Sequence, residues 1–360
     1  MPPDRHLQGV GMTLIEALDR SIHQALPIST SSNSTLNRGD LIEIQGPTGS
    51  GKTELLYFLA MRTIIPQEMR LVGHPPLKLE GREKSVIVCD CDNKWDILRL
   101  HRIMGSYLRA KVREIFPIVD LDANVVTAQI EQTIHDALRR LHFFRPASSA
   151  ALAATLLGLP RYHFTNMPEE EICMLMIDGG LSSFFWQDRW HVESTSKVSR
   201  EPGTSPTAGV VRALQCFRAS HNPVTFITNW AITPLSGSPF FFRQHVPPPY
   251  PAPFHVDRQG GPAPRVSPME VTHHVTLYKP HQSPIWDEEL PPDEEQEANP
   301  ADNSPQVYGI IRTPPCDVPE TIVTHFSFLV TDSGIASAVS PIDEELESER
   351  DCASQVSSPS

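Results

Sequence analysis

Runs dominated by apolar residues recur along the first two thirds of the chain, and each has the length of one strand. The four clearest are Leu41 to Ile44, Ser85 to Cys91, Ile172 to Ile177 and Val224 to Thr228. Short apolar runs that end in polar or turn residues are typical of strands buried on both faces of a parallel sheet. The pattern therefore predicts a central, buried sheet.

Apolar residues at helical spacing lie between these runs and predict the intervening helices. The segments are Lys94 to about Phe116, Ala123 to Arg140, a helix capped by Ser148 or Ser149 and ended by Pro160, and Ala208 to Ser220. Thr13 is placed to cap an earlier helix that runs to about Leu26. The apolar stripe of that helix either packs on the chain's own core or docks a partner.

Strand–helix alternation followed by strands alone defines the expected fold class. Late strands are predicted over Val271 to Tyr278, Tyr308 to Arg312 and Ile322 to Val330, the last two as a hairpin. Consecutive strand–helix units pair in parallel, whereas a hairpin adds antiparallel strands. We therefore expect an α/β protein with a mainly parallel sheet, helices on both faces and a C-terminal antiparallel extension.

The segment between the first predicted strand and its helix carries the strongest chemical signal. Its eight residues fit the phosphate-binding pattern G-x-x-x-x-G-K-[ST]. The glycines let successive backbone N–H groups turn toward an anion, and the helix that follows adds the positive end of its dipole. The expected nucleotide-binding residues are Gly46, Pro47, Thr48, Gly49, Ser50, Gly51, Lys52 and Thr53.

Two cofactors follow from this loop, ATP and Mg²⁺. Lys52 is expected to reach the β- and γ-phosphates, and the Thr53 hydroxyl to bind Mg²⁺. An apolar strand that ends in Asp178 matches the pattern of the second Mg²⁺-binding residue. Asp90 and Asp92 end another buried strand, at the edge where ligands bind in open α/β sheets.

Composition adds bounds on the partners. The 360 residues carry a formal net charge of −13, concentrated in Asp287 to Glu297 and Asp343 to Asp351, so the remainder is nearly neutral. Without a broad basic face, any DNA contact is expected to be local or supplied by a partner. No signal peptide is recognised, and the longest apolar run is too short to span a bilayer, so no membrane partner is expected.

These features divide the chain into five expected regions. They are an N-terminal helix and linker at 1–37, an ATP-binding core at 38–230, a Pro-rich and acidic, disordered insertion with one short strand at 231–305, a C-terminal hairpin that completes the sheet at 306–338, and a disordered acidic tail at 339–360.

Several residues outside the loop are further candidates for a site. The six cysteines form no C-x-x-C pair and are expected to be thiols of a cytosolic or nuclear protein. His273 and His274 lack ligand partners at suitable spacing and are expected at the surface. Phe184, Phe185 and Trp186 either face a partner or pack under the helix that follows.

Four segments together resemble the RecA-type recombinases, and within them the small eukaryotic recombinase paralogues. They are GPTGSGKTELLYFLAMRTIIP, SVIVCDCD with WDILRL after it, MLMIDGGLSSFFWQDR and HFSFLVTDSGI. The phosphate-binding loop alone is generic, but its combination with the other three is much more specific. The resemblance covers about residues 38–230, with a weaker return at 320–336.

The resemblance implies a RecA-like ATPase core and a role in homologous recombination repair of DNA double-strand breaks and interstrand crosslinks. It implies work in the nucleus, within a hetero-oligomer of recombinase paralogues that reaches DNA through the complex. It also places Asp92 where active members carry the glutamate that polarises the attacking water.

Departures from the family pattern imply slow hydrolysis. Asp92 is one methylene shorter than glutamate, and a misplacement near 1 Å can cost on the order of a hundredfold in rate. Gly179 stands where the recombinases usually have serine. Trp230 stands where they carry a glutamine that senses the γ-phosphate, and an indole cannot copy an amide. We therefore expect Asp92 to be a weak or vestigial catalytic residue, and the chain to be at most a weak or partner-dependent, DNA-dependent ATPase.

Two other functions stay open at this point. A free-standing P-loop phosphotransferase, such as a small-molecule kinase, would need an acceptor pocket and usually an Arg-rich lid, and no such cluster follows the loop. An interaction protein with an empty loop is the other alternative, although intact Lys52, Thr53 and Asp178 argue against decay of the site.

Overall fold

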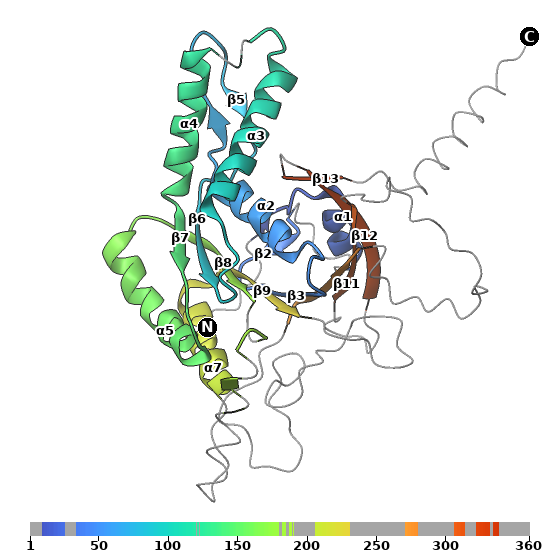
Figure 1. Cartoon of the computed structure of the whole chain (residues 1–360), viewed down its shortest axis with the longest axis vertical. Helices are drawn as coiled ribbons and strands as arrows, with labels where there is room; N and C mark the ends of the chain where they lie inside the picture. The colour runs from blue at the N-terminus through green and yellow to red at the C-terminus, as the bar shows by residue number, and fades with distance from the viewer. Residues whose placement is uncertain are drawn as a thin grey trace, which may run out of the picture.

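The computed structural model describes most of the predicted core and part of the late strands (Figure 1). The described residues are 9–25, 34–119, 121, 123–179, 182–184, 187–188, 190, 206–230, 271–279, 306–313, 322–331 and 334–337. The disorder expected within 231–305 and 339–360 lies outside them, apart from the strand near residue 275. Phe185 and Trp186 also lie outside them.

A sheet of nine described strands forms the centre of the molecule (Figure 1). In spatial order the strands are β13 (Gly334–Ser337), β12 (Ile322–Thr331), β11 (Gln306–Thr313), β10 (His273–Tyr278), β3 (Leu41–Gly46), β9 (Val224–Trp230), β8 (Ile172–Asp178), β6 (Ser85–Asp90) and β7 (Leu141–Phe144).

The strand directions divide this sheet into two parts. All pairs from β10 to β7 are parallel. The pairs β10–β11, β11–β12 and β12–β13 are antiparallel. The predicted α/β class, with its mainly parallel sheet and C-terminal antiparallel extension, is therefore confirmed.

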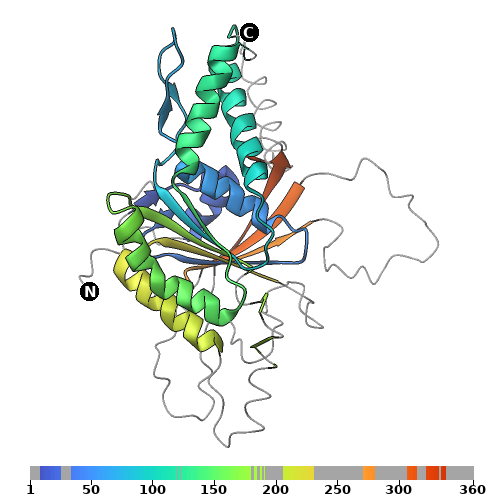
Figure 2. The ribbon, with the colours of Figure 1, turned by 60° about the vertical axis from the view of Figure 1, so that its left-hand side comes forward.

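Helices cover both faces of the sheet, as predicted (Figure 2). One apolar cluster joins the sheet to α1 (Glu16–Ala25), α2 (Lys52–Ile64), α3 (Ile97–Ile115) and α4 (Asn124–Leu138). A second cluster on the opposite face joins it to α5 (Ser149–Asn166) and α7 (Pro206–His221). Alternation along each strand feeds both clusters: in β6, Val86 and Val88 enter the first, whereas Ile87 and Cys89 enter the second.

The N-terminal helix packs on the chain's own core. Ile15, Leu18 and Ile22 are buried in the first cluster, and α1 lies against β12 and β11. The helix begins at Glu16 and not directly after Thr13. The carboxylate of Asp19 accepts hydrogen bonds from the backbone N–H groups of Thr13 and Leu14, at 2.7 and 2.8 Å, and so holds the chain that enters the helix.

Pro160 does not end a helix, contrary to the prediction. It lies inside α5, which continues to Asn166 and is capped at its start by Ser148. The helix continues because the turns beyond the proline are packed: the rings of Tyr162 and Phe144 lie 5.2 Å apart, and α5 runs along α7. This packing outweighs the hydrogen bond that proline cannot donate.

The expected surface position of His273 and His274 is wrong. His273 is buried, and burial lowers its pKa to about 4. His274 lies 3.0 Å from the buried carboxylate of Glu43 on β3. His273 is covered because its face of β10 packs against Leu18 and Ile22 of α1. His274 points to the opposite face, where its side chain stays 16% exposed.

The connection from Pro66 to Lys84 is more ordered than the predicted surface loop. It contains the antiparallel pair β4 (Glu68–Met69) and β5 (Leu77–Lys78), and it buries Met69, Leu71 and Leu79. A second small pair, β1 (Gly9–Gly11) with β2 (Leu36–Asn37), lies near the N-terminus. Among the described helices, none combines the length and apolar character that a bilayer crossing needs.

Candidate nucleotide-binding site

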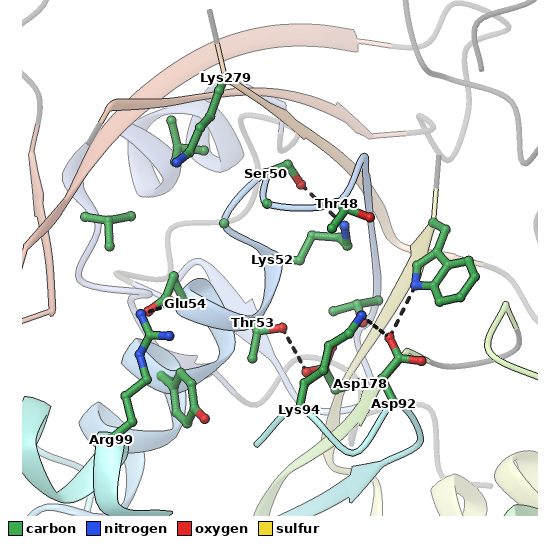
Figure 3. Close-up of a pocket in the computed structure, with 17 residues that line it drawn as sticks. Thr48, Ser50, Lys52, Thr53, Glu54, Asp92, Lys94, Arg99, Asp178 and Lys279 are labelled. Carbon is green, nitrogen blue, oxygen red and sulfur yellow. Dashed lines mark hydrogen bonds and ion pairs between the residues drawn. The ribbon is translucent and has the colours of Figure 1, made fainter. Parts of the chain in front are cut away.

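A cavity of about 400 Å³ lies at the carboxyl ends of β3, β6, β8 and β9, around the start of α2 (Figure 3). It brings together residues from seven separated stretches of the chain. The lining residues are Thr48, Gly49, Ser50, Gly51, Lys52, Thr53, Glu54, Tyr57, Asp92, Lys94, Arg99, Asp178, Thr228, Trp230, Lys279, Val307 and Val330.

Glycine is required at three points of the loop. Gly49 and Gly51 have φ angles of 78° and 90°, a left-handed conformation that side chains strongly disfavour. At Gly46 a Cβ atom would collide with the carbonyl oxygen of Leu277 and the hydroxyl group of Ser50. The loop thus folds as a tight backbone turn that leads directly into α2 at Lys52.

The ammonium group of Lys52 is bound by the loop itself. Its Nζ donates hydrogen bonds to the carbonyl oxygens of Gly46 and Pro47, at 2.6 and 2.8 Å. Burial lowers the pKa of Lys52 to about 8. Carbonyl groups are neutral, so an anion in the cavity would be a stronger partner for this charge.

Thr53 and Asp178 meet across the cavity, although they are 125 positions apart. The Thr53 hydroxyl donates to a carboxylate oxygen of Asp178 at 3.0 Å. The indole N–H of Trp95 and the hydroxyl of Thr228 donate to the same carboxylate, at 2.9 and 2.5 Å. Burial raises the pKa of Asp178, while these three hydrogen bonds oppose the rise.

This oxygen pair fits Mg²⁺, which prefers oxygen ligands and usually keeps several waters and substrate phosphates in its shell. The described residues contain no group of three or more His, Cys, Asp or Glu arranged for a metal ion. The oxygen ligands of Thr53 and Asp178 therefore suit a metal ion that is also bound by a phosphate. They are too few for a metal ion bound by protein side chains alone. A cation would also offset the cost of the buried Asp178 charge.

The turn from β6 to α3 carries a further set of cavity residues. Asp90 is buried, and its carboxylate accepts from the backbone N–H groups of Lys94 and Trp95, at 3.0 and 3.2 Å. This clamp presents Asp92 to the cavity. Asp92 accepts from the Lys94 ammonium at 2.5 Å, the Trp230 indole N–H at 3.3 Å and the Ser183 hydroxyl.

The local structure explains why glycine occupies position 179. Its φ of 79° is left-handed, and a Cβ atom there would lie 2.5 Å from the carboxyl carbon of Asp92. A serine at this position would therefore push Asp92 away from its present place. Gly179 and the shorter Asp92 are mutually compatible parts of one arrangement.

The other end of the cavity is more mixed in character. Arg99 forms a 2.6 Å ion pair with Glu54 and lies 5.8 Å from the centre of the Tyr57 ring. Val307 on β11 and Lys279 after β10 complete this end. An apolar and aromatic wall with a few charged groups is what organic ligands commonly meet in protein pockets.

The structure gathers all the sequence-predicted site residues at one place, because Gly46 and Pro47 bind Lys52 and the others line the cavity. Sequence reasoning missed Lys94, Trp95 and Thr228. Lys94 and Trp95 lie at the start of the helix predicted after Asp92, and Thr228 lies near the end of β9, the strand beside β8. The sequence indicates that these residues lie near the ends of strands, but it does not indicate which residues they contact.

Fold and site together define an α/β protein with a RecA-like core and a glycine-rich loop that has the sequence pattern of a phosphate-binding loop. Over 151 residues the chain is 30% identical to the DNA repair protein XRCC2 of Mus musculus, covering 42% of this chain and 43% of that protein. It is 25% identical to the DNA repair protein XRCC2 homolog of Arabidopsis thaliana over 171 residues, covering 43% of each. The alignments thus span less than half of these relatives. No family model matches the chain.

Proposed function

We propose that the chain is an ATP-binding subunit of a heteromeric complex that assists homologous recombination repair of DNA. Nucleotide binding is supported by the cavity, which the glycine-rich loop, Lys52, Thr53 and Asp178 line together. In it the hydroxyl of Thr53 lies 3.0 Å from the carboxylate of Asp178. The repair part rests on the similarity to XRCC2 proteins and on the four sequence segments that resemble recombinase paralogues.

In this proposal each group has one task. The loop N–H groups and Lys52 bind the phosphates, Thr53 and Asp178 hold Mg²⁺, and the nucleoside extends toward Arg99. ATP with Mg²⁺ supplies negative charge that pairs Lys52 and positive charge that pairs Asp178. The bound nucleotide then stabilises the core by mass action, and with it the surfaces that partners contact.

Hydrolysis is proposed to be slow or to depend on partners. Among the described residues, Lys94, Trp230 and Ser183 donate hydrogen bonds to Asp92 and occupy the carboxylate that a water would need. A partner subunit or DNA would have to change this arrangement for efficient turnover. We propose that the partners are other RecA-type paralogues, that DNA is reached through the complex, and that the chain acts in the nucleus.

The small-molecule kinase is not favoured by any feature of the described residues. Arg99 is the single arginine that lines the cavity there, and it is paired with Glu54. An Arg-rich lid around the phosphates is absent from this described lining.

Cells that lack the chain are expected to be hypersensitive to an agent that forms DNA interstrand crosslinks, because such lesions need recombination for repair. The measurement is colony survival against dose, with re-expression of the chain restoring survival and osmotic stress as the unrelated control. Unchanged survival after loss of the chain would contradict the repair role.

A further inference from the structure

Lys94 is a charged residue of the cavity lining that has no assigned task in the proposed function. It leaves the β6–α3 turn and points into the same cavity as Lys52 (Figure 3). Its Nζ lies 2.5 Å from a carboxylate oxygen of Asp92 and 5.5 Å from the centre of the Trp230 ring. The side chain of Lys94 is 49% exposed, so its position is set by these two partners and not by packing.

The two lysines face one space. After burial and the opposing effect of Asp178, the positive charge of Lys94 is a further cause that lowers the pKa of Lys52. Two ammonium groups that repel each other across a cavity favour an anion placed between them. A terminal phosphate carries the most negative charge that a nucleotide can bring to this position.

Lys94 can move without dismantling the site. Its backbone N–H stays on Asp90, so the turn is held while the long side chain changes rotamer. Asp92 is only 7% exposed and keeps the donors from Trp230 and Ser183 when the ammonium leaves. The rearrangement is therefore confined to one flexible side chain.

We propose that Lys94 is a γ-phosphate ligand that lets this chain distinguish nucleoside triphosphates from diphosphates. The inference rests on the proposed nucleotide site and deepens it. Without a triphosphate the Lys94 ammonium group pairs with Asp92 and lies over the Trp230 ring. A γ-phosphate, which lies beyond the phosphates of a diphosphate, draws the ammonium away, whereas a diphosphate leaves it in place.

Trp230 then reports the state of the site. Departure of the ammonium removes a cation from the indole face and a neighbour from the Asp92 carboxylate. The emission of Trp230 is expected to change on binding a triphosphate and not a diphosphate. Because the chain has five tryptophans, the signal is taken as the difference from Trp230→Phe.

The test measures two affinities by calorimetry in the presence of Mg²⁺. One ligand is ADP, and the other is the non-hydrolysable imidotriphosphate analogue of ATP. In Lys94→Met the affinity for the triphosphate is expected to fall about tenfold, the lower end for one charged hydrogen bond, with ADP affinity unchanged. Lys94→Arg should retain the preference. Equal losses for both ligands, or no loss for either, would overturn the proposal.

A charge-matched variant distinguishes a direct contact of Lys94 with the phosphate from mere neutralisation of the Asp92 charge by Lys94. Lys94→Met alone removes the cation that is paired with Asp92. The negative charge of Asp92 would then repel the triphosphate and by itself weaken its binding. In Lys94→Met combined with Asp92→Asn both charges are gone, so the net charge of the cavity is that of the wild type. The proposal expects triphosphate preference to stay low in this double variant; recovery of the preference would show that Lys94 only neutralises Asp92, against the proposal.

Failure of this inference is distinguishable from failure of the proposed function. If the wild-type chain binds neither nucleotide, the nucleotide site itself is wrong. If it binds both and Lys94→Met behaves as the wild type, only the role of Lys94 is wrong. Lys111→Met, a lysine of α3 paired with Glu114 outside the cavity lining, is the control and should match the wild type.

Discussion

Lys52→Ala is expected to lower the affinity for Mg²⁺–ATP by about a hundredfold or more. The substitution removes a charged donor from the phosphates, and hydrogen bonds to charged groups contribute about 1.5–3 kcal/mol each. It also releases the carbonyl groups of Gly46 and Pro47, which Lys52 now holds at 2.6 and 2.8 Å. Calorimetric titration of the purified chain measures the effect directly, with Lys111→Ala as the remote control.

The pH dependence of binding gives this prediction a second readout. Burial lowers the pKa of Lys52 to about 8, so the free site loses the ammonium proton as pH rises above that value. A bound phosphate favours the charged form, so binding takes up a proton and wild-type affinity falls with rising pH above about 8. Lys52→Ala should lack this fall. Wild-type affinity that stays constant between pH 7.5 and about 9.5 would contradict the role of Lys52.

The same variant separates an adaptor from an enzyme. If the chain works mainly as a subunit, Lys52→Ala retains assembly with its partners. If it works as a kinase, every function is lost together with nucleotide binding. Assembly and binding are therefore measured on the same preparation.

Asp178→Asn is expected to remove most of the Mg²⁺ contribution to nucleotide affinity, on the order of tenfold or more, with little loss of stability in the ligand-free chain. Magnesium prefers charged oxygen ligands, and an amide provides a weaker one. Burial raises the pKa of Asp178, so the charged form is disfavoured in the folded state. This cost grows as pH rises from the unfolded pKa of the carboxyl group through the raised one, and it is fully present above the raised pKa.

Thermal unfolding tests both halves of that expectation. Saturating Mg²⁺–ATP at about 100 times its dissociation constant should stabilise the wild type by about 2.7 kcal/mol. Asp178→Asn should show a much smaller shift from an unchanged or slightly higher starting temperature. A variant that unfolds already without ligand, or that keeps its full Mg²⁺ dependence, would contradict the assigned role. Asp136→Asn, an exposed carboxylate on α4, is the matched control.

Local patterns were sufficient for much of the fold and for the candidate phosphate residues. The strands that carry Ile44, Val88 and Met176 read as apolar runs because they are buried on both faces. The loop from Gly46 to Thr53 is contiguous, so its spacing alone defines it. The end of an apolar run marked Asp178, since the carboxyl ends of parallel strands share one edge of the sheet.

Contacts between distant segments could not be read in the same way. Trp95 donates to Asp178 across 83 positions, and the partner of an indole N–H has no local signature. The burial of His273 has no local signature either, because it comes from Leu18 and Ile22 of α1, which pack over that face of β10. Pro160 has the sequence signature of a helix end, but packing beyond it keeps α5 intact. In each case tertiary packing decided against a local preference.

Affinity purification of the tagged chain from its own cells, with quantitative mass spectrometry, tests the central claim most directly. The account predicts that another RecA-type protein is recovered in near-equimolar amount, both with wild-type chain and with Lys52→Ala. Recovery of the chain alone, as a monomer without any RecA-type partner, would contradict its assignment as a subunit of a recombination complex.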